Sequence, residues 1–182
     1  MSGPARAWRA TDNARPVSGK GNGHEYRYVL HRERVALFAE GLVCWVMLNP
    51  STADDEHDDA TIRRVIGFSW RWGYARLVVV NLYGVRATDP AELRAMTLHE
   101  AVGPRNDEQV EAWTATADMV VCAWGAMVND LRDGAARVRH VHRKYLDRRT
   151  VHCLGTSSSG EPLHPLYLAA DLEPVEYRRN LA

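Results

Sequence analysis

The sequence predicts an α/β protein in which helices cover both faces of a central, mostly parallel sheet, a three-layer sandwich. Two observations support this prediction. Short apolar runs alternate with helix-length periodic segments, and such alternation favours parallel strands joined by helical crossovers. Runs such as LVCWVML are also apolar at successive positions, which is typical of strands that are buried on both faces.

Five apolar or β-branched runs are expected to be strands. The run LVCWVML has no polar face and therefore belongs in the middle of the sheet, while LVVVNL and MVVCAW are expected to be buried. The expected strands are residues 26–30, 42–48, 77–82, 119–124 and 150–154.

Four segments carry helix signals. Residues 61–72 place apolar side chains at helical spacing, and Gly73 stands where such a helix would end. Asp89 is a capping residue, Pro90 suits the first helical position, and Glu92 follows the cap by three residues. This pattern predicts a short helix through about residue 96. Helices are also expected at residues 106–116 and 126–147, the latter either as one helix or as two that are divided at Gly134.

The chain is expected to form one domain over residues 25–182, after a flexible leader at residues 1–24 that has little apolar surface. Lys plus Arg and Asp plus Glu both number 23, so no net charge attracts the protein to nucleic acid or to an anionic membrane. No apolar run approaches the roughly 20 residues that span a bilayer, and no signal peptide is visible. We therefore expect a cytoplasmic protein with no membrane partner.

The sequence carries no cofactor motif. Cys44, Cys122 and Cys153 stand singly in or beside apolar runs, which fits reduced structural thiols and not a zinc or iron–sulfur site. A Walker loop, a dinucleotide-binding glycine motif and a G-x-S-x-G nucleophile elbow are all missing. We expect no cofactor.

Polar or small residues follow four expected strands, where α/β sheets bind ligands. Asn49, Asn81 and Trp124-Gly125 end the second to fourth strands, and His164 lies in the loop after the fifth. Asn49 precedes proline and is either a turn residue or a group that orients a water or a sugar hydroxyl. Asn81 either caps a neighbouring loop or hydrogen-bonds the edge of a planar ligand such as a nucleobase. His164 is either a surface residue or a group that serves a developing oxyanion or accepts a proton.

The acidic run DDEHDD at residues 54–59 has two interpretations. Its carboxylates suit a hard cation, but the run lacks the glycine and the spaced ligands of a calcium loop. Asp58 and Asp59 directly precede a helix whose N-terminus favours negative charge, so helix capping is the preferred interpretation. Asp54 is close enough in sequence to Asn49 to share a pocket with it, which makes Asp54 a candidate catalytic residue. The less favoured alternative is a metal-dependent hydrolase built on Asp54, Asp55, His57, Asp58 and Asp59.

Two further segments are candidate phosphate sites. Residues 137–149 hold six Lys or Arg residues, which form either a solvated helix face or a patch for phosphate or a partner. Residues 156–160 read Thr-Ser-Ser-Ser-Gly, and the backbone N–H groups of such a tract can cradle a phosphate.

Several longer motifs closely resemble a bacterial family catalogued as domain of unknown function 1643. They are VMLNPSTAD, DDATIRR, WGYARLVVVNLYGVRATDP, Gly103-Pro104-Arg105-Asn106-Asp107, AWG and GEPLHPLYL. The resemblance covers about residues 25–170 and implies no activity.

The order of the strand-end motifs is also similar to the uracil-DNA glycosylase superfamily. That superfamily has a Gly-x-Asn-Pro-Gly-type loop, a strand with Leu-Leu-Asn, a strand with Trp-Gly and a late His-Pro loop. The matching motifs here are Leu48-Asn49-Pro50-Ser51, Val80-Asn81, Ala123-Trp124-Gly125 and His164-Pro165. The resemblance implies a uracil-DNA glycosylase-like architecture.

The same resemblance implies roles for individual residues. Asn49 would position an attacking water or stabilise cationic character at the sugar C1′, and His164 would stabilise negative charge on the departing base. Asn81 would hydrogen-bond the edge of the base. The implied substrate-binding residues are Pro50, Ser51, Asn81, Tyr83, Trp124, Gly125 and Pro165.

Two departures from the superfamily pattern bear on the substrate. Ser51 replaces the usual glycine or tyrosine, and His164-Pro165-Leu166-Tyr167 lacks the serine-proline continuation of the loop that helps known glycosylases flip a base. With zero net charge, these departures favour a small nucleobase-containing ligand or a single nucleotide over nucleic acid. We therefore expect a nucleobase-binding protein with N-glycosidase activity. The alternative is a non-enzymatic binding module that retains the pocket and uses the basic residues 137–149 for a partner.

Overall fold

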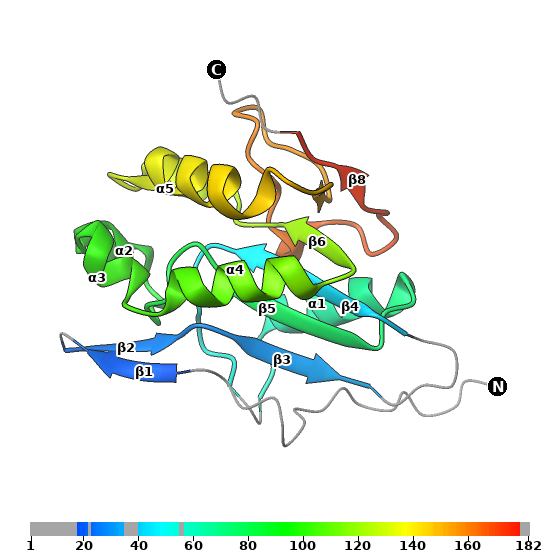
Figure 1. The fold of residues 1–182 in the computed structure, drawn as a ribbon, viewed down its shortest axis with the longest axis horizontal. Coiled ribbons are helices and arrows are strands. Elements are labelled where there is room, and N and C mark those ends of the chain that lie inside the picture. Colours follow the sequence, from blue (N-terminus) through cyan, green and yellow to red (C-terminus); the bar gives the residue numbers. More distant parts are fainter. Residues whose placement is uncertain (1–17, 22, 35–39, 55–56, 179–182) are drawn as a thin grey trace.

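The protein is seen here as a computed structural model that describes residues 18–21, 23–34, 40–54 and 57–178. Its main sheet has six strands in the order β3-β5-β4-β6-β7-β8, and a separate hairpin pairs β1 with β2 (Figure 1). Strands β5, β4, β6 and β7 are parallel, whereas β3 and β8 run antiparallel at the two edges. The strands are β1 (Ser18–Gly21), β2 (His24–Arg27), β3 (Leu30–Glu33), β4 (Leu42–Met47), β5 (Arg76–Asn81), β6 (Met119–Cys122), β7 (His152–Cys153) and β8 (Val175–Glu176).

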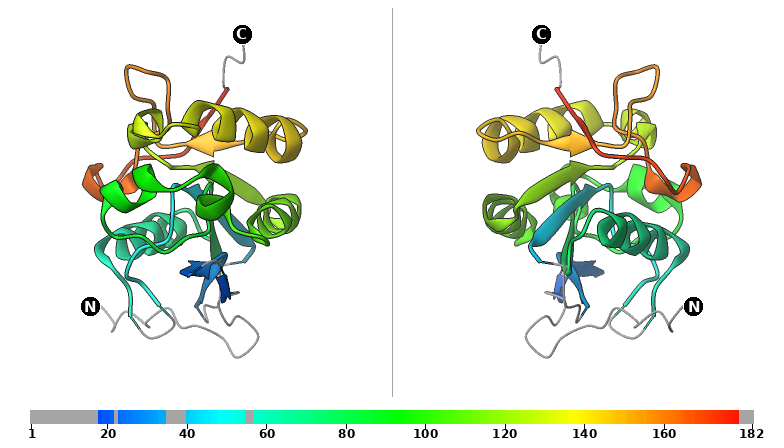
Figure 2. Two further views of the ribbon diagram at one scale, coloured as in Figure 1. Left: turned by 90° about the vertical axis from the view of Figure 1, so that its left-hand side faces the viewer. Right: turned by 90° about the vertical axis from the view of Figure 1, so that its right-hand side faces the viewer.

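Helices flank this sheet, with α1 on one side and α4 and α5 on the other (Figure 2). The α/β class and the largely parallel sheet that the sequence predicts are therefore confirmed. The helices are α1 (Ala60–Arg71), α2 (Pro90–Ala95), α3 (Leu98–Val102), α4 (Asn106–Thr116) and α5 (Gly134–Val141), and the short 3-10 or π turns are η1 (Ala126–Asp130), η2 (His142–Leu146) and η3 (Pro165–Tyr167).

The central strand β4 separates two apolar cores, because successive side chains of a strand point to opposite faces. On one face, Trp45 stacks on Trp72 with ring centroids 5.5 Å apart and belongs to the same core as Phe68 of α1. On the other face, Cys44 belongs to the core that includes Val110 of α4. All residues of β4 are buried, which explains why its sequence has no polar face.

The predicted helix-start signals act as expected. Asp59 caps α1 by accepting a hydrogen bond from the backbone N–H of Ile62 at 2.8 Å. Asp89 caps α2 by accepting one from the backbone N–H of Ala91 at 2.8 Å. The helix expected over residues 106–116 is α4. These local signals therefore set the helix boundaries.

Other elements differ from the sequence-based expectation. The strand expected at residues 26–30 is divided between β2 and β3, and the helical segment 126–147 is divided into η1, α5 and η2. The break at Gly134 is confirmed, since α5 begins at this residue after η1 has ended, and a Cβ added there would lie 1.8 Å from the carbonyl oxygen of Val128. That close approach requires glycine. The strand expected at residues 150–154 shortens to β7.

Two short elements were not predicted. The helix α3 follows a capping box in which Thr97 accepts from the backbone of Glu100 while the Glu100 carboxylate accepts from the backbone of Thr97. This Thr-x-x-Glu signal is visible in the sequence. The other element, β8, is an exposed two-residue edge strand that has no local signal.

The expected leader, residues 1–24, overlaps the hairpin. Residues 1–17 and 22 lie outside the described residues, but Ser18–Gly21 forms β1 and pairs with β2. The glycine backbone of this strand lies over tyrosine rings, since a Cβ added to Gly19 would be 3.7 Å from the ring of Tyr28. Backbone pairing and this contact organise a stretch with few apolar side chains.

The cysteines and the helix lengths bear on two further predictions. Cys44, Cys122 and Cys153 are all buried with free thiols. Burial raises the pKa of the Cys44 thiol to about 12, which fits a packing role. In the described part of the chain, no helix is long and apolar enough to cross a membrane.

Candidate functional site

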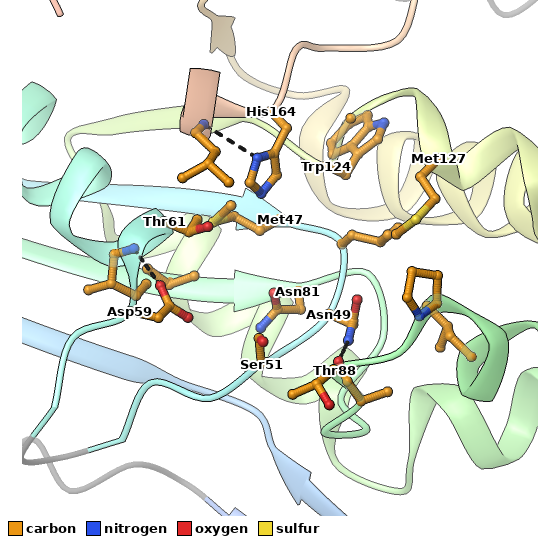
Figure 3. Close-up of a pocket in the computed structure, with 18 of the residues that line it drawn as sticks. Met47, Asn49, Ser51, Asp59, Thr61, Asn81, Thr88, Trp124, Met127 and His164 are labelled. Atoms are coloured by element: carbon orange, nitrogen blue, oxygen red, sulfur yellow. Dashed lines mark hydrogen bonds between the residues drawn. The ribbon is translucent and has the colours of Figure 1, made fainter. Parts of the chain in front are cut away.

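A pocket of about 620 Å³ opens at the carboxyl ends of the parallel strands (Figure 3). Its walls include the ends of β4 and β5, the loop after β6 and the His164 loop. This is the edge at which open α/β sheets bind ligands, because the strand-to-helix loops meet there. Asn49, Asn81 and His164 all line the pocket, as do Ser51, Trp124 and Gly125.

Sheet register brings the two asparagines together. Met47 at the end of β4 pairs with Asn81 at the end of β5, and Asn49 follows Met47 by two residues. The pairing continues beyond the strands, since the backbone N–H of Leu82 donates to the Met47 carbonyl at 2.8 Å. The two carboxamides therefore enter the pocket from neighbouring strands.

The side chain of Asn49 is oriented by its own loop. Its Nδ2 donates to the carbonyl of Ala87 at 2.8 Å and to the carbonyl of Pro50 at 3.0 Å. Both amide hydrogens are thereby directed at the protein backbone. The opposite atom, Oδ1, is the acceptor that a water in the pocket can use.

Asn81 differs from Asn49 because its carboxamide has no internal partner. The residue is only 3% exposed, and its side chain makes no hydrogen bond to any described residue. Its backbone carbonyl is held by Asn106, whose Nδ2 donates to it at 2.9 Å. The backbone is thus anchored while the side-chain donor and acceptor face the pocket (Figure 3).

His164 enters the pocket from the loop after β7. Its Nδ1 accepts a long hydrogen bond of 3.4 Å from the backbone N–H of Leu166, which places the hydrogen of a neutral ring on Nε2. Burial lowers the pKa of His164, although the nearby Asp59 carboxylate acts in the opposite direction. The ring is therefore a neutral donor directed into the pocket (Figure 3).

Gly125 allows the His164 loop to approach the sheet. Its φ of +77° is strained for other residues, and a Cβ at this position would lie 3.2 Å from the Cβ of His164. The backbone N–H of Gly125 also donates to the Pro162 carbonyl at 3.0 Å. Close backbone contact between these two loops sets the position of the histidine.

Trp124 forms a rigid wall of the pocket. It is 1% exposed, and its indole N–H donates to the carboxylate of Glu161 at 2.8 Å. The ring also meets Tyr177 edge to face, with centroids 6.0 Å apart. The indole is therefore part of the apolar core that supports the pocket.

Several pocket residues were missed by the sequence analysis. Arg27, Asp59, Thr61 and Thr88 line the pocket, together with the rim residue Tyr167, which is 91% exposed. Arg27 carried a visible signal, because it is a charged residue inside the apolar segment YRYVL. Asp59 was considered only as a helix cap or a metal ligand, and Thr61, Thr88 and Tyr167 carried no signal, since their loops reach the site only through the fold.

Four predicted site residues do not line the pocket. Pro50 uses its carbonyl to accept from the backbone N–H of Ala87 at 3.2 Å, and Pro165 begins η3. Tyr83 is buried in the core of the α4 face, where burial raises the pKa of its hydroxyl to about 12. Asp54 turns its carboxylate to its own loop and accepts from the backbone N–H of His57 at 2.7 Å.

The acidic run has a structural role in the described residues. Asp59 caps α1, and Asp58 pairs with Arg32, whose Nη2 lies 2.7 Å from the carboxylate. Arg32 also donates to the carbonyl of Asp54 at 2.6 Å. Residues 55 and 56 lie outside the described residues. Within the rest, no group of three or more His, Cys, Asp or Glu side chains is arranged to hold a metal ion.

The two candidate phosphate segments do not line the pocket either. In the basic run, Arg137 is buried and pairs with Asp107 at 2.6 Å, while Arg149 donates to the carbonyls of Thr114 and Ala117. Two of the six basic residues of this run therefore serve the internal structure. The serine tract forms a turn in which the Ser157 and Ser159 hydroxyls are 2.9 Å apart.

Comparison with known proteins identifies a single family. The family described as "Protein of unknown function (DUF1643)" matches residues 27–166, which is more than half of the chain. Neither the curated proteins nor the solved structures include a match.

Proposed function

The chain belongs to the DUF1643 family of proteins of unknown function, and we propose that its pocket binds a small nucleobase-containing ligand and hydrolyses the N-glycosidic bond. The observation that carries this proposal is the carboxamide of Asn81. It is almost fully buried, lines the pocket, and has no hydrogen-bond partner among the described residues. A ligand is the natural partner for such a group.

The carboxamide of Asn81 selects the kind of ligand. It offers one donor and one acceptor side by side in a plane, which match an adjacent acceptor and donor on the edge of a nucleobase. A buried amide that stays unpaired costs roughly 1–3 kcal/mol, so a ligand that pairs with both atoms recovers that energy. An apolar ligand of similar size recovers none of this energy, because it cannot hydrogen-bond to the carboxamide.

The surrounding walls suit a flat ring. Trp124, Met47 and Ile62 contribute apolar surface, and the volume of about 620 Å³ falls in the usual range for small-molecule sites. The indole of Trp124 is held by Glu161 and is 1% exposed, so it supports the pocket from the core and keeps its shape fixed. The ordered strand-end motifs that resemble uracil-DNA glycosylases also support this ligand class.

Asn49 and His164 supply the chemistry of the proposed hydrolysis. As the C1′–N bond breaks, its electron pair moves to the base, and the Nε2–H of His164 stabilises the negative charge that develops there. Asn49 orients a water through Oδ1, and the water oxygen bonds to C1′. The proton that the water releases neutralises the departing base, so the products are a free base and a sugar hydroxyl. This route needs no carboxylate, in keeping with the position of Asp54 outside the pocket.

A binding module without activity is the second candidate function. The observation in its favour is that Nδ2 of Asn49 bonds to the Pro50 and Ala87 carbonyls, which gives this residue a structural role without any reaction. In that case the pocket recognises its ligand through Asn81 and releases it unchanged. The two candidates differ in whether base is released.

Release of free base, measured by mass spectrometry, tests the proposal. The panel contains nucleosides, nucleotides and oligonucleotides with modified bases. We expect Asn49→Ala to lower the rate of release by roughly 100-fold or more, since it removes the group that orients the water. Asn81→Ala should lower kcat/KM by roughly 10- to 100-fold through loss of base recognition.

Asn129→Ala is the matched control, because this exposed asparagine bonds to Ser159 and lies outside the pocket. Its activity should equal that of the unaltered protein. Tight binding of a panel member with no base release, unchanged by Asn49→Ala, would establish the binding module. Absence of both binding and release across the panel would refute the nucleobase proposal.

A further inference from the structure

We infer that Arg27 binds a phosphate group, so that the preferred ligand of the pocket is a nucleoside monophosphate and not a nucleoside. The base half of this inference rests on the proposed function, whereas the phosphate half depends only on Arg27 and its surroundings. Arg27 ends β2 and lines the same pocket as Asn81 and His164.

Two nitrogens of the Arg27 guanidinium are buried without a hydrogen-bond partner in the described structure. The residue is only 3% exposed, and its Nε and Nη1 are buried atoms that have no hydrogen-bond acceptor in the described structure. Burial and the neighbouring Arg86 lower the pKa of Arg27 to about 10, so the group is still charged at neutral pH. A buried positive charge without an acceptor is strongly unfavourable unless an anion binds beside it.

The other two buried arginines of the described chain, Arg32 and Arg137, each pair with a carboxylate. Arg32, equally buried, bonds to the carboxylate of Asp58 and to the carbonyls of His31 and Asp54. Arg137 bonds to Asp107 and to the carbonyl of Leu82. Among the buried arginines of the described chain, Arg27 therefore stands apart in having no carboxylate partner, and it lies at the pocket.

Charges around Arg27 leave it available to a ligand. Asp59 and Asp54 act on it electrostatically, yet neither comes within 4.0 Å to form an ion pair. Arg86 and Arg32 add positive charge nearby. Asp59 also lines the pocket and opposes an anion, so the phosphate must sit on the guanidinium side and away from that carboxylate.

A phosphate suits this position better than a carboxylate. Arginine binds either group through two parallel N–H bonds, but a phosphate has further oxygens that need donors. The hydroxyl groups of Ser51, Thr61 and Thr88 line the same pocket and can donate to them (Figure 3). The volume of about 620 Å³ accommodates a base, a sugar and a phosphate together.

Calorimetric titration of the full chain tests the assignment. The probes are inorganic phosphate, acetate, the four common ribonucleosides and their 5′-monophosphates. We expect at least one monophosphate to bind roughly 10- to 100-fold more tightly than its nucleoside, because hydrogen bonds between charged groups contribute about that much affinity. Inorganic phosphate alone should bind weakly, and acetate should bind more weakly still.

Three variants connect the result to Arg27. Arg27→Met keeps similar volume and should remove the advantage of the monophosphate and the binding of inorganic phosphate, while Arg27→Lys should retain part of both. Arg86→Met removes a nearby charge that lies outside the pocket lining and should leave the advantage nearly intact. Thermal unfolding of each variant shows that it is folded before titration.

The outcomes separate this inference from the proposed function. Binding of inorganic phosphate that requires Arg27, without binding of any nucleoside or nucleotide, supports the phosphate site and refutes the nucleobase function. Equal affinity for a nucleoside and its monophosphate, unaffected by Arg27→Met, refutes the phosphate site and leaves the nucleobase function standing. Tighter binding of acetate than of phosphate also overturns the assignment, because the anion is then a carboxylate.

Discussion

Two arginines from successive strands show how differently one fold can treat the same buried group. Arg27 of β2 and Arg32 of β3 are both 3% exposed. Arg32 is surrounded by acceptors from the acidic loop, including the Asp58 carboxylate 2.7 Å from its Nη2. Arg27 faces the pocket, and its Nε and Nη1 have no acceptor in the described structure.

The difference identifies which region is built for stability and which for binding. A charge that the fold buries needs partners, and around Arg32 the chain supplies all of them. In the acidic run, Asp59 is thereby explained as a helix cap and Asp58 as an ion-pair partner of Arg32. At the pocket, polar groups of Arg27 and Asn81 have no hydrogen-bond partner in the described structure, and a ligand can offset the energetic cost of leaving them unpaired.

The largest expected effect comes from replacing each arginine by methionine. Arg32→Met leaves the Asp58 carboxylate and two carbonyls without their donor, so we expect a loss of roughly 2–4 kcal/mol in the free energy of unfolding. Arg27→Met removes a charge that had no partner, so the ligand-free protein should stay within about 1 kcal/mol of the original or become more stable. Urea unfolding measures both. An equal loss of stability in the two variants would contradict the conclusion that only Arg32 is stabilised by partners within the protein.

The next largest effect is expected at Gly125, where close backbone contact with the His164 loop positions the histidine. Gly125→Ala introduces a Cβ at a φ of +77° and 3.2 Å from the Cβ of His164, so we expect a loss of roughly 2–3 kcal/mol in stability and a lower rate of base release. Gly160→Ala is the matched control, because its φ of +79° is similar and nothing lies within 4 Å of the added Cβ. It should reduce stability less and leave base release unchanged. Similar activity in both variants would show that the close approach at Gly125 is unimportant.

The loss of stability at acid pH should come mainly from His31, the neighbour of Arg32. Burial, followed by the charge of Arg32, lowers the pKa of His31 from 6.5 to about 4. The unfolded chain therefore binds this proton first, and stability falls as the pH drops from 6.5 towards 4. Since His31 is partly screened by solvent, we expect a loss of roughly 1–2 kcal/mol between pH 7 and pH 5.

Urea unfolding at the two pH values measures this loss. His31→Gln cannot take up the proton and should reduce the difference between pH 7 and pH 5, whereas His57→Gln, at a side chain that is 78% exposed, should not. The lowered pKa of His164 acts in the same direction and contributes to what remains. An unchanged difference in His31→Gln would remove His31 from this account.

The smallest expected effect is a change in phosphate affinity at the pocket when Asp59 loses its charge. Asp59→Asn keeps a good helix cap but removes a negative charge that acts on Arg27, so inorganic phosphate should bind roughly two- to five-fold more tightly. Asp89→Asn makes the same change at another pocket-lining cap, α2, and should have less effect. Calorimetric titration compares the two. Weaker phosphate binding in Asp59→Asn would mean that this carboxylate orients Arg27 and does not oppose the anion.

Local patterns in the sequence were sufficient for much of the fold. Strands β4 and β5 are continuous apolar runs, and α4 occupies residues 106–116 as expected, because burial on both faces and helix periodicity leave direct marks on composition. The placement of Asn49, Asn81 and His164 at one edge followed from the rule that parallel strands end together. The capping box of α3 was also readable but was overlooked.

Other parts of the site had no local mark. Tyr83 was implied by the glycosylase resemblance and Asp54 was expected from its closeness in sequence to Asn49, yet neither lines the pocket. Both residues lie beyond the ends of their strands, where the alternation of a strand no longer sets the direction of a side chain. The roles of Asp58 and Arg32 likewise depend on a contact between residues 26 positions apart.

By itself, the sequence determined the α/β class, the central strands and the strand-end polar residues, because each depends on patterns within a few neighbouring positions. Only the tertiary structure decided that Arg32 would be given acceptors and Arg27 would not. The two residues look alike in sequence, each being an arginine in a short strand segment. What separates them is the distribution of acceptors in the space around each guanidinium, which long-range packing alone creates.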